Sequence, residues 1–161
     1  MKIKFLLILT IAAFLPTSGC SAPETKIEYS EPDSWSQSNF GPAIFYLNPK
    51  DSDESIQFVA ERSISQDYQM NDLTDLIENE KQNCITFEIL SEQVTSINEL
   101  QAFEFVESCH DKELNVLYKI KSIRIMKNNQ LAEFNLYSKE NRFEENEAIF
   151  DTVVHSINWN D

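Results

Sequence analysis

Four runs of strand-forming residues follow one another in the second half of the chain, and no helix-forming segment separates them. Each run concentrates or alternates apolar side chains over the length of one strand, as strands buried on at least one face do. Strands in direct succession pair antiparallel, so the pattern predicts a meander and excludes a doubly wound parallel sheet. The predicted strands are Ile85 to Val94, Leu100 to Ser108, Leu114 to Met126 and Leu131 to Tyr137, with turns at Asn98-Glu99, His110-Asp111 and Asn128-Asn129.

Two further strands and two helices flank this meander. The strands are a short apolar run and a run that alternates with a period of two, joined by a turn rich in Asn, Pro and Asp. In each helix, apolar residues recur at three and four positions. Two helices exclude a pure β-sandwich, so we predict an α+β fold with a central antiparallel sheet of about six strands. The flanking elements are Pro42 to Leu47, Ile56 to Ala60, a helix that is capped by Asn71 or Asp72 and ends near Asn83, and a helix from Glu145 to Ile157.

The N-terminus has the pattern of a secretory signal peptide. Two lysines precede an apolar run from Phe5 to Phe14, and a proline and small residues then lead to Cys20. The run is about half as long as the ~20 residues that span a bilayer, so we do not expect a permanent transmembrane helix. Small residues immediately before a cysteine resemble the bacterial lipobox, at which the cysteine is acylated and becomes the new N-terminus. We therefore predict that Cys20 is the lipid-attachment residue.

The same segment leaves one alternative open and carries a sorting signal. Thr17 stands where the lipobox usually has leucine, so ordinary cleavage after Ala22 and a freely secreted product remain an alternative. By the same resemblance, Ser21 after the cysteine implies sorting to the outer membrane of a Gram-negative cell, facing the periplasm. We predict a lipoprotein signal peptide over residues 1–19, a lipidated N-terminus and tether over 20–34, and a single domain over 35–161.

The chain is strongly acidic. It has 27 Asp and Glu against 13 Lys and Arg, a net charge of −14. A nucleic-acid partner is excluded, because contact with phosphates requires a basic face. A partner steered to this protein by charge should be basic. Contact with the membrane is expected through the N-terminal lipid and not through the domain.

The order of the predicted elements resembles that of the Mog1/PsbP-like domains of the DcrB type. Three short motifs add to the resemblance: Pro32-x-x-Trp35, Ile97-Asn98-Glu99-Leu100-Gln101-Ala102 and Phe150-x-x-Val153-x-x-Ser156-Ile157. Glu99 stands where the family tends to have glycine. The resemblance implies an α/β/α sandwich used mostly for protein contacts, as in extrinsic photosystem subunits, a nuclear GTPase binder, and accessory or immunity proteins of secretion systems. It implies no enzymatic activity and no cofactor, and it assigns no binding residue.

Two cysteines lie within the predicted domain, Cys84 and Cys109. An even number of cysteines in an oxidising compartment favours a disulfide. A hairpin that turns at Asn98-Glu99 places Val94 opposite Phe103 and Cys109 opposite Glu88, four positions from Cys84. That is about 13 Å along a strand, beyond the roughly 7 Å that a disulfide allows between Cα atoms, unless a bulge or the end of the helix closes the gap. A disulfide and two separate buried thiols both remain open.

Other candidate sites lack residues that their chemistry needs. Cys109, His110 and Asp111 are adjacent, but side chains of adjacent turn residues point apart, so we expect neither a nucleophile nor a metal site there. The acidic run that begins at Asp51 resembles a calcium loop, yet Ile56 and Arg62 occupy the positions of the required glycine and glutamate. A weak cation site at Asp51, Asp53 or the cluster from Glu144 to Asp151 is the remaining alternative to a solvated acidic face. We predict no catalytic residues and no metal ligands.

Three aromatic residues with polar tips, Trp35, Tyr46 and Trp159, are candidate interface residues, with packing at the core edge as the alternative. We expect a lipid-anchored, non-catalytic interaction domain of the cell envelope that docks or stabilises an envelope protein. Two alternatives are an immunity-type inhibitor of a secreted toxin and a lipoprotein that binds a small ligand or cation.

The prediction for Cys20 can be tested by fractionation. The variant Cys20→Ala lacks the thiol that would carry the acyl chains, so it should lose stable membrane attachment and appear in the soluble fraction. Immunoblots of membrane and soluble fractions measure the outcome. A variant that is processed and stays on the membrane as wild type does would contradict a lipid at this residue.

Overall fold

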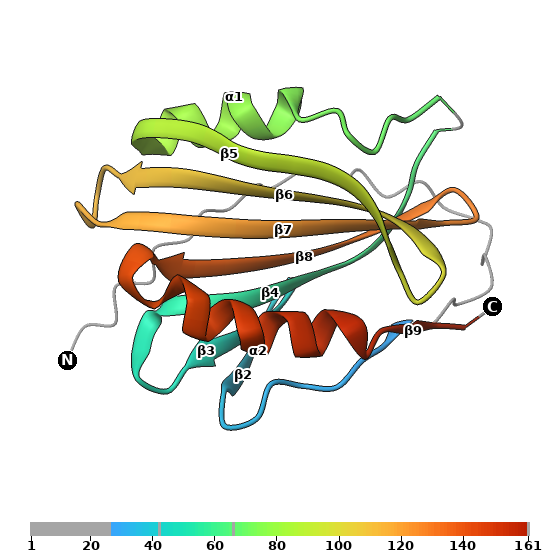
Figure 1. The fold of residues 1–161 in the computed structure, drawn as a ribbon, viewed down its shortest axis with the longest axis horizontal. Helices are drawn as coiled ribbons and strands as arrows, with labels where there is room; N and C mark the ends of the chain where they lie inside the picture. The colour runs from blue at the N-terminus through green and yellow to red at the C-terminus, as the bar shows by residue number, and fades with distance from the viewer. Residues whose placement is uncertain (1–26, 42, 66, 161) are drawn as a thin grey trace.

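A computed structural model describes residues 27–41, 43–65 and 67–160 of the chain. A seven-stranded antiparallel sheet in the order β2-β3-β4-β8-β7-β6-β5 lies between the two helices (Figure 1). A separate two-stranded pairing joins β1 to β9. The elements are β1 (Ile27–Glu28), β2 (Ser36–Phe40), β3 (Ala43–Asn48), β4 (Asp51–Ser63), α1 (Thr74–Asn83), β5 (Cys84–Ile97), β6 (Leu100–Asp111), β7 (Leu117–Lys127), β8 (Gln130–Lys139), the 3₁₀ turn η1 (Glu140–Arg142), α2 (Phe143–His155) and β9 (Asn158–Trp159).

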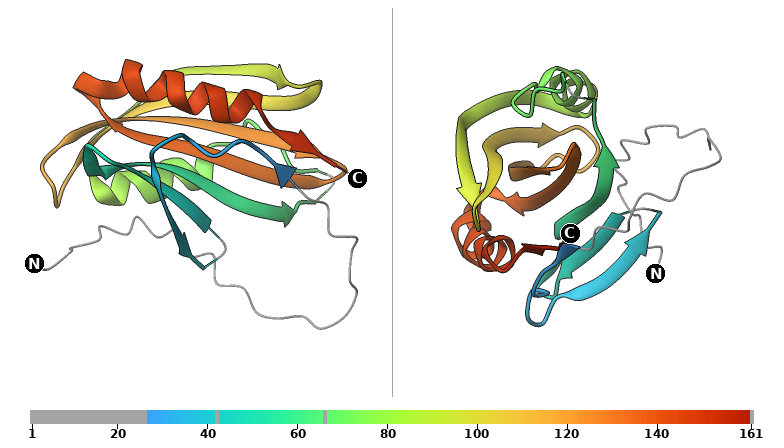
Figure 2. Two further views of the ribbon diagram at one scale, coloured as in Figure 1. Left: turned by 90° about the horizontal axis from the view of Figure 1, so that it is seen from below. Right: turned by 90° about the vertical axis from the view of Figure 1, so that its right-hand side faces the viewer.

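The curved sheet has a hydrophobic core on each face, and one helix covers each core (Figure 2). Adjacent residues of one strand belong to different cores, because side chains of a strand alternate between the two faces. On β6, Ala102 packs in the core with α2, whereas Phe103 packs in the core with Leu73, the residue before α1. On β8, Leu131 and Ala132 divide in the same way. The central strands are therefore buried on both faces, which requires a helix on each side.

The predicted α+β fold, the meander and both helices are confirmed, with seven strands in the main sheet where about six were expected. Strand β2 is the additional one. Its sequence, Ser-Gln-Ser-Asn-Phe, has little apolar patterning, and it forms an edge that pairs only with β3. Polar edge strands give a weak sequence signal because neither face must be apolar.

The fold begins inside the segment that the sequence assigned to the tether. Ile27 pairs with Trp159, and Tyr29 packs edge-on against Phe58 and Phe134, at ring-centroid distances of 5.1 and 5.4 Å. The predicted start near Trp35 is therefore too late. The two prolines of the segment suggested a linker, but its few apolar side chains find partners only in the folded chain.

The turn between β5 and β6 is backbone-strained and also holds the end of α2. Asn98 and Glu99 have positive φ angles of 48° and 69°. Asparagine tolerates this conformation better than glutamate does. The Asn98 side-chain amide donates to the backbone oxygens of His155 and Ile157, at 2.9 and 2.7 Å. The hairpin turn thereby satisfies carbonyl groups at the C-terminal end of α2, which have no partners within the helix.

A buried carboxylate, Glu54, joins several elements at the other end of α2. Glu54 is fully buried, and its oxygens accept from Arg142 Nη1 at 2.8 Å, Asn48 Nδ2 at 3.0 Å and the Lys139 backbone N–H at 3.1 Å. Asn146 of α2 donates to Ser138 and accepts from Asn48 within the same network. The network ties β3, β4 and β8 to the start of α2, and its bonds offset the cost of burying the charge.

We predict that Glu54→Gln lowers the free energy of unfolding by about 3 kcal/mol, because it leaves Arg142 without its buried counter-charge. Denaturant unfolding measures this change. The matched control is Glu145→Gln, which breaks an exposed pair with Lys50 and should change the free energy far less. Equal effects of the two variants would contradict a structural role for the Glu54 network.

Candidate functional site

Strand β5 forms one edge of the main sheet, and its outer edge is not paired with any strand that the structure describes (Figure 1). It carries all three of the exposed large hydrophobic residues found among the described residues. Ile85 is 54%, Leu90 44% and Val94 67% exposed. An exposed apolar row on an open edge strand offers both backbone groups and side chains to another chain. We take the outer edge of β5 as the candidate functional site.

Two β-bulges explain why two of these side chains are exposed. The pairing of β5 with β6 shifts between Cys84 and Thr86, and again between Ile89 and Ser91. The residues passed over at the shifts are Ile85 and Leu90, so neither has a partner residue on β6. A bulge leaves its extra residue outside the ladder and turns the strand locally. Ile85 and Leu90 are therefore exposed by backbone geometry, not by a lack of core to fill.

The candidate edge is acidic as well as apolar. From Cys84 to Ile97 the strand has two glutamates, Glu88 and Glu92, and no lysine or arginine. Both glutamates are exposed. Lysine commonly protects edge strands from pairing, and it is missing here. The charge of the edge matches that of the whole chain and favours a basic partner.

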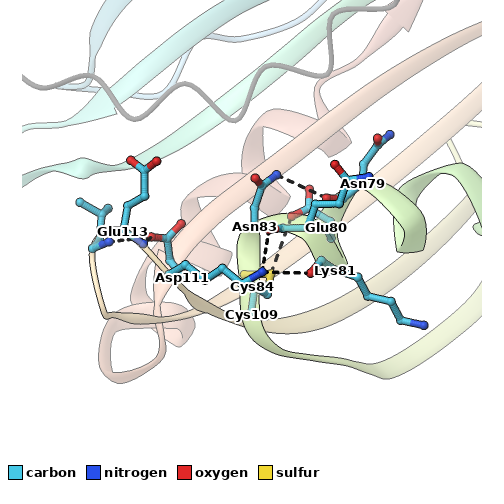
Figure 3. The surroundings of a disulfide bond; sticks show 11 residues. Asn79, Glu80, Lys81, Asn83, Cys84, Cys109, Asp111 and Glu113 are labelled. Carbon is cyan, nitrogen blue, oxygen red and sulfur yellow. Dashed lines mark hydrogen bonds between the residues drawn. A yellow bond between two sulfur atoms is a disulfide. The ribbon is translucent and has the colours of Figure 1, made fainter.

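A disulfide fixes the first residue of this strand. Cys84 and Cys109 are joined, with their Cα atoms 5.4 Å apart (Figure 3). The expected register holds at Val94 opposite Phe103, but the bulge at Leu90 moves Cys109 opposite Phe87. The second bulge, together with the turn out of α1, brings Cys84 opposite Asp111. The shifts that expose Ile85 and Leu90 thus also bring the sulfur atoms together.

Near the disulfide, three acidic side chains are buried, one from α1 and two from β6. Glu80, Glu107 and Asp111 are 4%, 1% and 2% exposed. Asp111 accepts two backbone N–H bonds, from Glu113 and Leu114. Glu107 Oε2 is buried without a hydrogen-bond partner.

Burial and neighbouring charge both affect the protonation of these carboxyl groups. Burial, reinforced by the carboxylates of Glu80 and Glu133, raises the pKa of Glu107 to about 8, although Arg124 opposes the shift. Burial, reinforced by Asp111, also raises the pKa of Glu80. Glu107 is therefore largely protonated near neutral pH, which removes the cost of an uncompensated buried charge.

The three predicted interface aromatics are not brought together on the surface. Tyr46 and Trp159 are buried in the core with α2, and the half-buried Trp35 packs against the same core. The Tyr29 and Tyr46 hydroxyl groups lie 3.2 Å apart. These three aromatic residues therefore pack in or against the core, which was the alternative to an interface role. Cys20 lies outside the described residues.

Lysine side chains form ion pairs with the acidic clusters that were candidate cation sites. Lys139 contacts Asp51 at 2.5 Å and Asp53 at 3.6 Å. Lys121 of β7 contacts Glu147 and Asp151 of α2, at 3.0 and 2.9 Å. These ammonium groups supply the positive charge that a bound cation would otherwise supply.

The two histidines lie on different elements. His110 Nε2 is 3.1 Å from the Asn115 side-chain oxygen, and His155 is exposed in the last turn of α2. Cys109 is bound in the disulfide, so its sulfur is not available as a nucleophile beside His110. The adjacency of Cys109, His110 and Asp111 in the sequence therefore does not create a catalytic group.

A hollow of about 450 Å³ lies at the start of α2. Its lining is polar and contains both cationic and acidic side chains. The lining residues are Lys119, Glu140, Asn141, Arg142, Phe143, Glu144 and Glu145. Separately, none of the helices in the described part of the chain is long and apolar enough to cross a membrane.

Sequence reasoning missed Ile85 and Leu90 as surface residues. It assigned both to a regular strand, where a large apolar residue is expected to face the core. The signal that could have found them is a break in alternation: Cys84-Ile85 and Ile89-Leu90 each place two apolar residues side by side. Such a pair places apolar groups on both faces of a strand unless a bulge intervenes.

Comparisons with known proteins identify the fold. No protein-family model matches the chain, and no curated protein sequence does. The chain is similar to the solution structure of cyanobacterial PsbP (CyanoP) from Synechocystis sp. PCC 6803, with a TM-score of 0.61 and 16% identity over 89% of this chain and 97% of that one. It is also similar to LpqN of Mycobacterium tuberculosis, described as involved in cell envelope biogenesis, with a TM-score of 0.62 and 12% identity over 85% and 84%.

A third similarity is to a chain of the Tle4-Tli4 complex, with a TM-score of 0.50 and 15% identity over 71% of this chain and 44% of that one. At these identities the likeness concerns the fold. The chain has a PsbP-like fold, as the order of its predicted elements indicated.

We predict that Glu107 makes the domain less stable as the pH rises. The pKa of Glu107 is about 8 in the folded chain and about 4.5 when the side chain is exposed. Its contribution to the free energy of unfolding is therefore fully present below about pH 4.5 and is lost as the pH rises to about 8. Relative to Glu107→Gln, which does not titrate, the wild type should lose about 3 kcal/mol of unfolding free energy from about pH 5 to about pH 8.

Denaturant unfolding of both proteins across this range measures the effect. The exposed Glu113→Gln serves as the control and should leave the wild-type pH profile unchanged. If the free energies of unfolding of wild type and Glu107→Gln differ by the same amount at every pH in this range, Glu107 does not titrate in this way.

Proposed function

We propose that this PsbP-like domain is a lipid-anchored, non-catalytic protein-interaction module of the bacterial cell envelope. In this proposal the domain faces the periplasm, and it docks or stabilises an envelope protein through the outer edge of β5. The observation that carries the proposal is the position of Ile85, Leu90 and Val94, the three exposed large apolar residues, on one open edge strand.

The chemistry of β5 supports pairing with an extended segment. An added strand gains main-chain hydrogen bonds from the edge, and alternate side chains determine its specificity. The apolar side chains of β5 can be buried by the incoming segment. The exposed Glu88 and Glu92 favour lysine or arginine on that segment. The expected partner is therefore basic, as the net charge of −14 also favours.

The proposed location rests on the N-terminal sequence and on one structural neighbour. A signal peptide and a lipobox-like Cys20 favour a lipid anchor, and Ser21 favours the outer membrane. LpqN, which has a similar fold, is described as involved in cell envelope biogenesis. Both observations favour the envelope over the cytoplasm.

The non-catalytic part of the proposal rests on the arrangement of reactive groups. General acid–base or nucleophilic catalysis requires groups that meet at a site where substrate can bind. His110 and His155 are on different elements, and the sulfurs of Cys84 and Cys109 are bound to each other. The carboxyl group with the strongly raised pKa, Glu107, is 1% exposed.

An immunity-type inhibitor of a secreted toxin is the second candidate function. The similarity to a chain of the Tle4-Tli4 complex favours it, and so does the acidic charge, which suits a basic effector. Inhibition requires the partner to lose activity on binding, whereas docking does not. A ligand-binding lipoprotein is a third alternative, for which the hollow at the start of α2 offers a cavity among the described residues.

Site-directed photo-crosslinking in intact cells tests the proposed interface. A crosslinking residue at position 94 should couple the full-length chain to one discrete partner, because this side chain is exposed on the outer edge. The same residue at position 37, exposed on the opposite edge strand β2, should not give that product. In the native chain, Val94→Lys should weaken partner binding about tenfold, since it removes an apolar contact and adds repulsion toward a basic segment.

The affinity is measured with the purified domain and the crosslinked partner, at low and high salt. Crosslinks of equal yield from both positions, or unchanged binding by Val94→Lys, would exclude β5 as the interface. Loss of the partner's enzymatic activity on binding would favour the immunity function over docking.

A further inference from the structure

Three potential metal ligands, Glu80, Cys84 and Cys109, converge where α1 ends and β5 begins, and the buried Glu107 interacts electrostatically with Glu80. Glu80 is in the last turn of α1, and Cys84, four residues later, is the C-cap of α1 and the first residue of β5. Glu107 and Cys109 are two residues apart on β6 and point to the same face of the sheet, the face that α1 covers. The chain thus brings a carboxyl group of α1 and the sulfur of the first residue of β5 close to the sulfur of Cys109 on β6.

Three of these ligands are already close together. One ligand atom from each of Glu80, Cys84 and Cys109 lies within 4.8 Å of the others, and all three residues are buried. Glu80 Oε2 is 4.0 Å from Cys84 Sγ, and the Glu80 side chain turns toward the disulfide (Figure 3). A tetrahedral site with metal–sulfur bonds of about 2.3 Å needs neighbouring donors at about this spacing.

The fourth candidate, Glu107, is a carboxyl group without a partner. It is 1% exposed, and its Oε2 has no hydrogen bond. The nearby guanidinium of Arg124 is committed to Glu133 and to backbone oxygens at the start of α1, those of Met70 and Asp72. A buried carboxyl group that interacts with the carboxyl group of Glu80 is a position where a cation bound at Glu80 would be stabilised.

We propose that, when the disulfide is reduced, Cys84, Cys109, Glu80 and Glu107 bind a thiophilic divalent cation such as Zn²⁺ or Cd²⁺. A dithiol supplies two electrons and two protons, so the S–S bond breaks, two thiols form and the dithiol becomes a disulfide. Binding of the cation then displaces the two thiol protons and any proton held by the two carboxyl groups. Thiolate ligands select Zn²⁺ and Cd²⁺ over Mg²⁺ and Ca²⁺.

The oxidation state of the chain decides whether the site exists. In the disulfide each sulfur is bonded to the other, and no thiolate is available as a ligand. Reduction frees both sulfurs beside the buried Glu80 carboxyl group, with which Glu107 interacts. The two sulfurs can therefore act as ligands in the reduced protein but not in the oxidised protein.

Titration of the full domain with Cd²⁺ tests the proposal. The protein is reduced with dithiothreitol, freed of reductant without air, and titrated while the thiolate-to-cadmium charge-transfer absorption is recorded. One Cd²⁺ per chain should bind to the reduced protein, and none should give this absorption with the oxidised protein. Glu80→Gln and Glu107→Gln should each weaken binding at least about tenfold, since even outer-shell partners of a metal site contribute that much.

Two controls separate a built site from two free thiols. Glu113→Gln, which removes an exposed carboxylate in the neighbouring turn, should bind Cd²⁺ as wild type does. The double variant Cys84→Ser with Cys109→Ser should give no charge-transfer absorption. If reduction alone unfolds the domain, Cd²⁺ should restore its near-ultraviolet circular dichroism in wild type and not in Glu80→Gln.

Three results would overturn the proposal. The first is an absence of charge-transfer absorption in the reduced wild type. The second is equal affinity of wild type, Glu80→Gln and Glu107→Gln, which would mean that the thiols bind without the carboxylates. The third is Cd²⁺ binding by an unfolded reduced chain that regains no structure.

Discussion

The central strands β6, β7 and β8 have apolar side chains on both faces, and this burial determines the rest of the architecture. Ala102 and Phe103 are adjacent, but their side chains are buried in the cores on opposite faces of the sheet. Only a layer on each side of the sheet can provide this, so α1 and α2 cover opposite faces. Strand β5, at the end of the sheet farthest from β2, then has one edge that pairs with no other strand among the described elements.

Two bulges in β5 connect two features that the sequence alone does not relate. Each bulge moves the register of β5 by one residue against β6. Together they bring Cys84 near Cys109, and they leave Ile85 and Leu90 outside the ladder. The disulfide fixes the end of the strand whose outer edge we propose as the interaction surface, so the covalent bond and the exposure of Ile85 and Leu90 share one geometric cause.

Two buried glutamates show how the surroundings decide the role of a carboxyl group. Glu54 is fully buried but is paired with Arg142 and accepts further hydrogen bonds, so it joins strands to a helix as an ion. Glu107 is equally buried, yet it has no such partner, and burial and nearby carboxylates raise its pKa. The first glutamate explains how the fold is held together, whereas the second marks the pocket where we infer a redox-dependent cation site.

The sequence alone determined the class of fold, the order of the meander, both helices and the acidic character of the protein, because these depend on periodicity and composition, which are local. Tertiary structure alone decided the pairing of Ile27 with Trp159, the polar edge strand β2 and the burial of Tyr46 and Trp159. It also decided the register at the cysteines, since a bulge of one residue changes which side chains meet without changing the composition of the strand. The candidate site depends on that register, so its position could not be predicted from residues 84–97 taken by themselves.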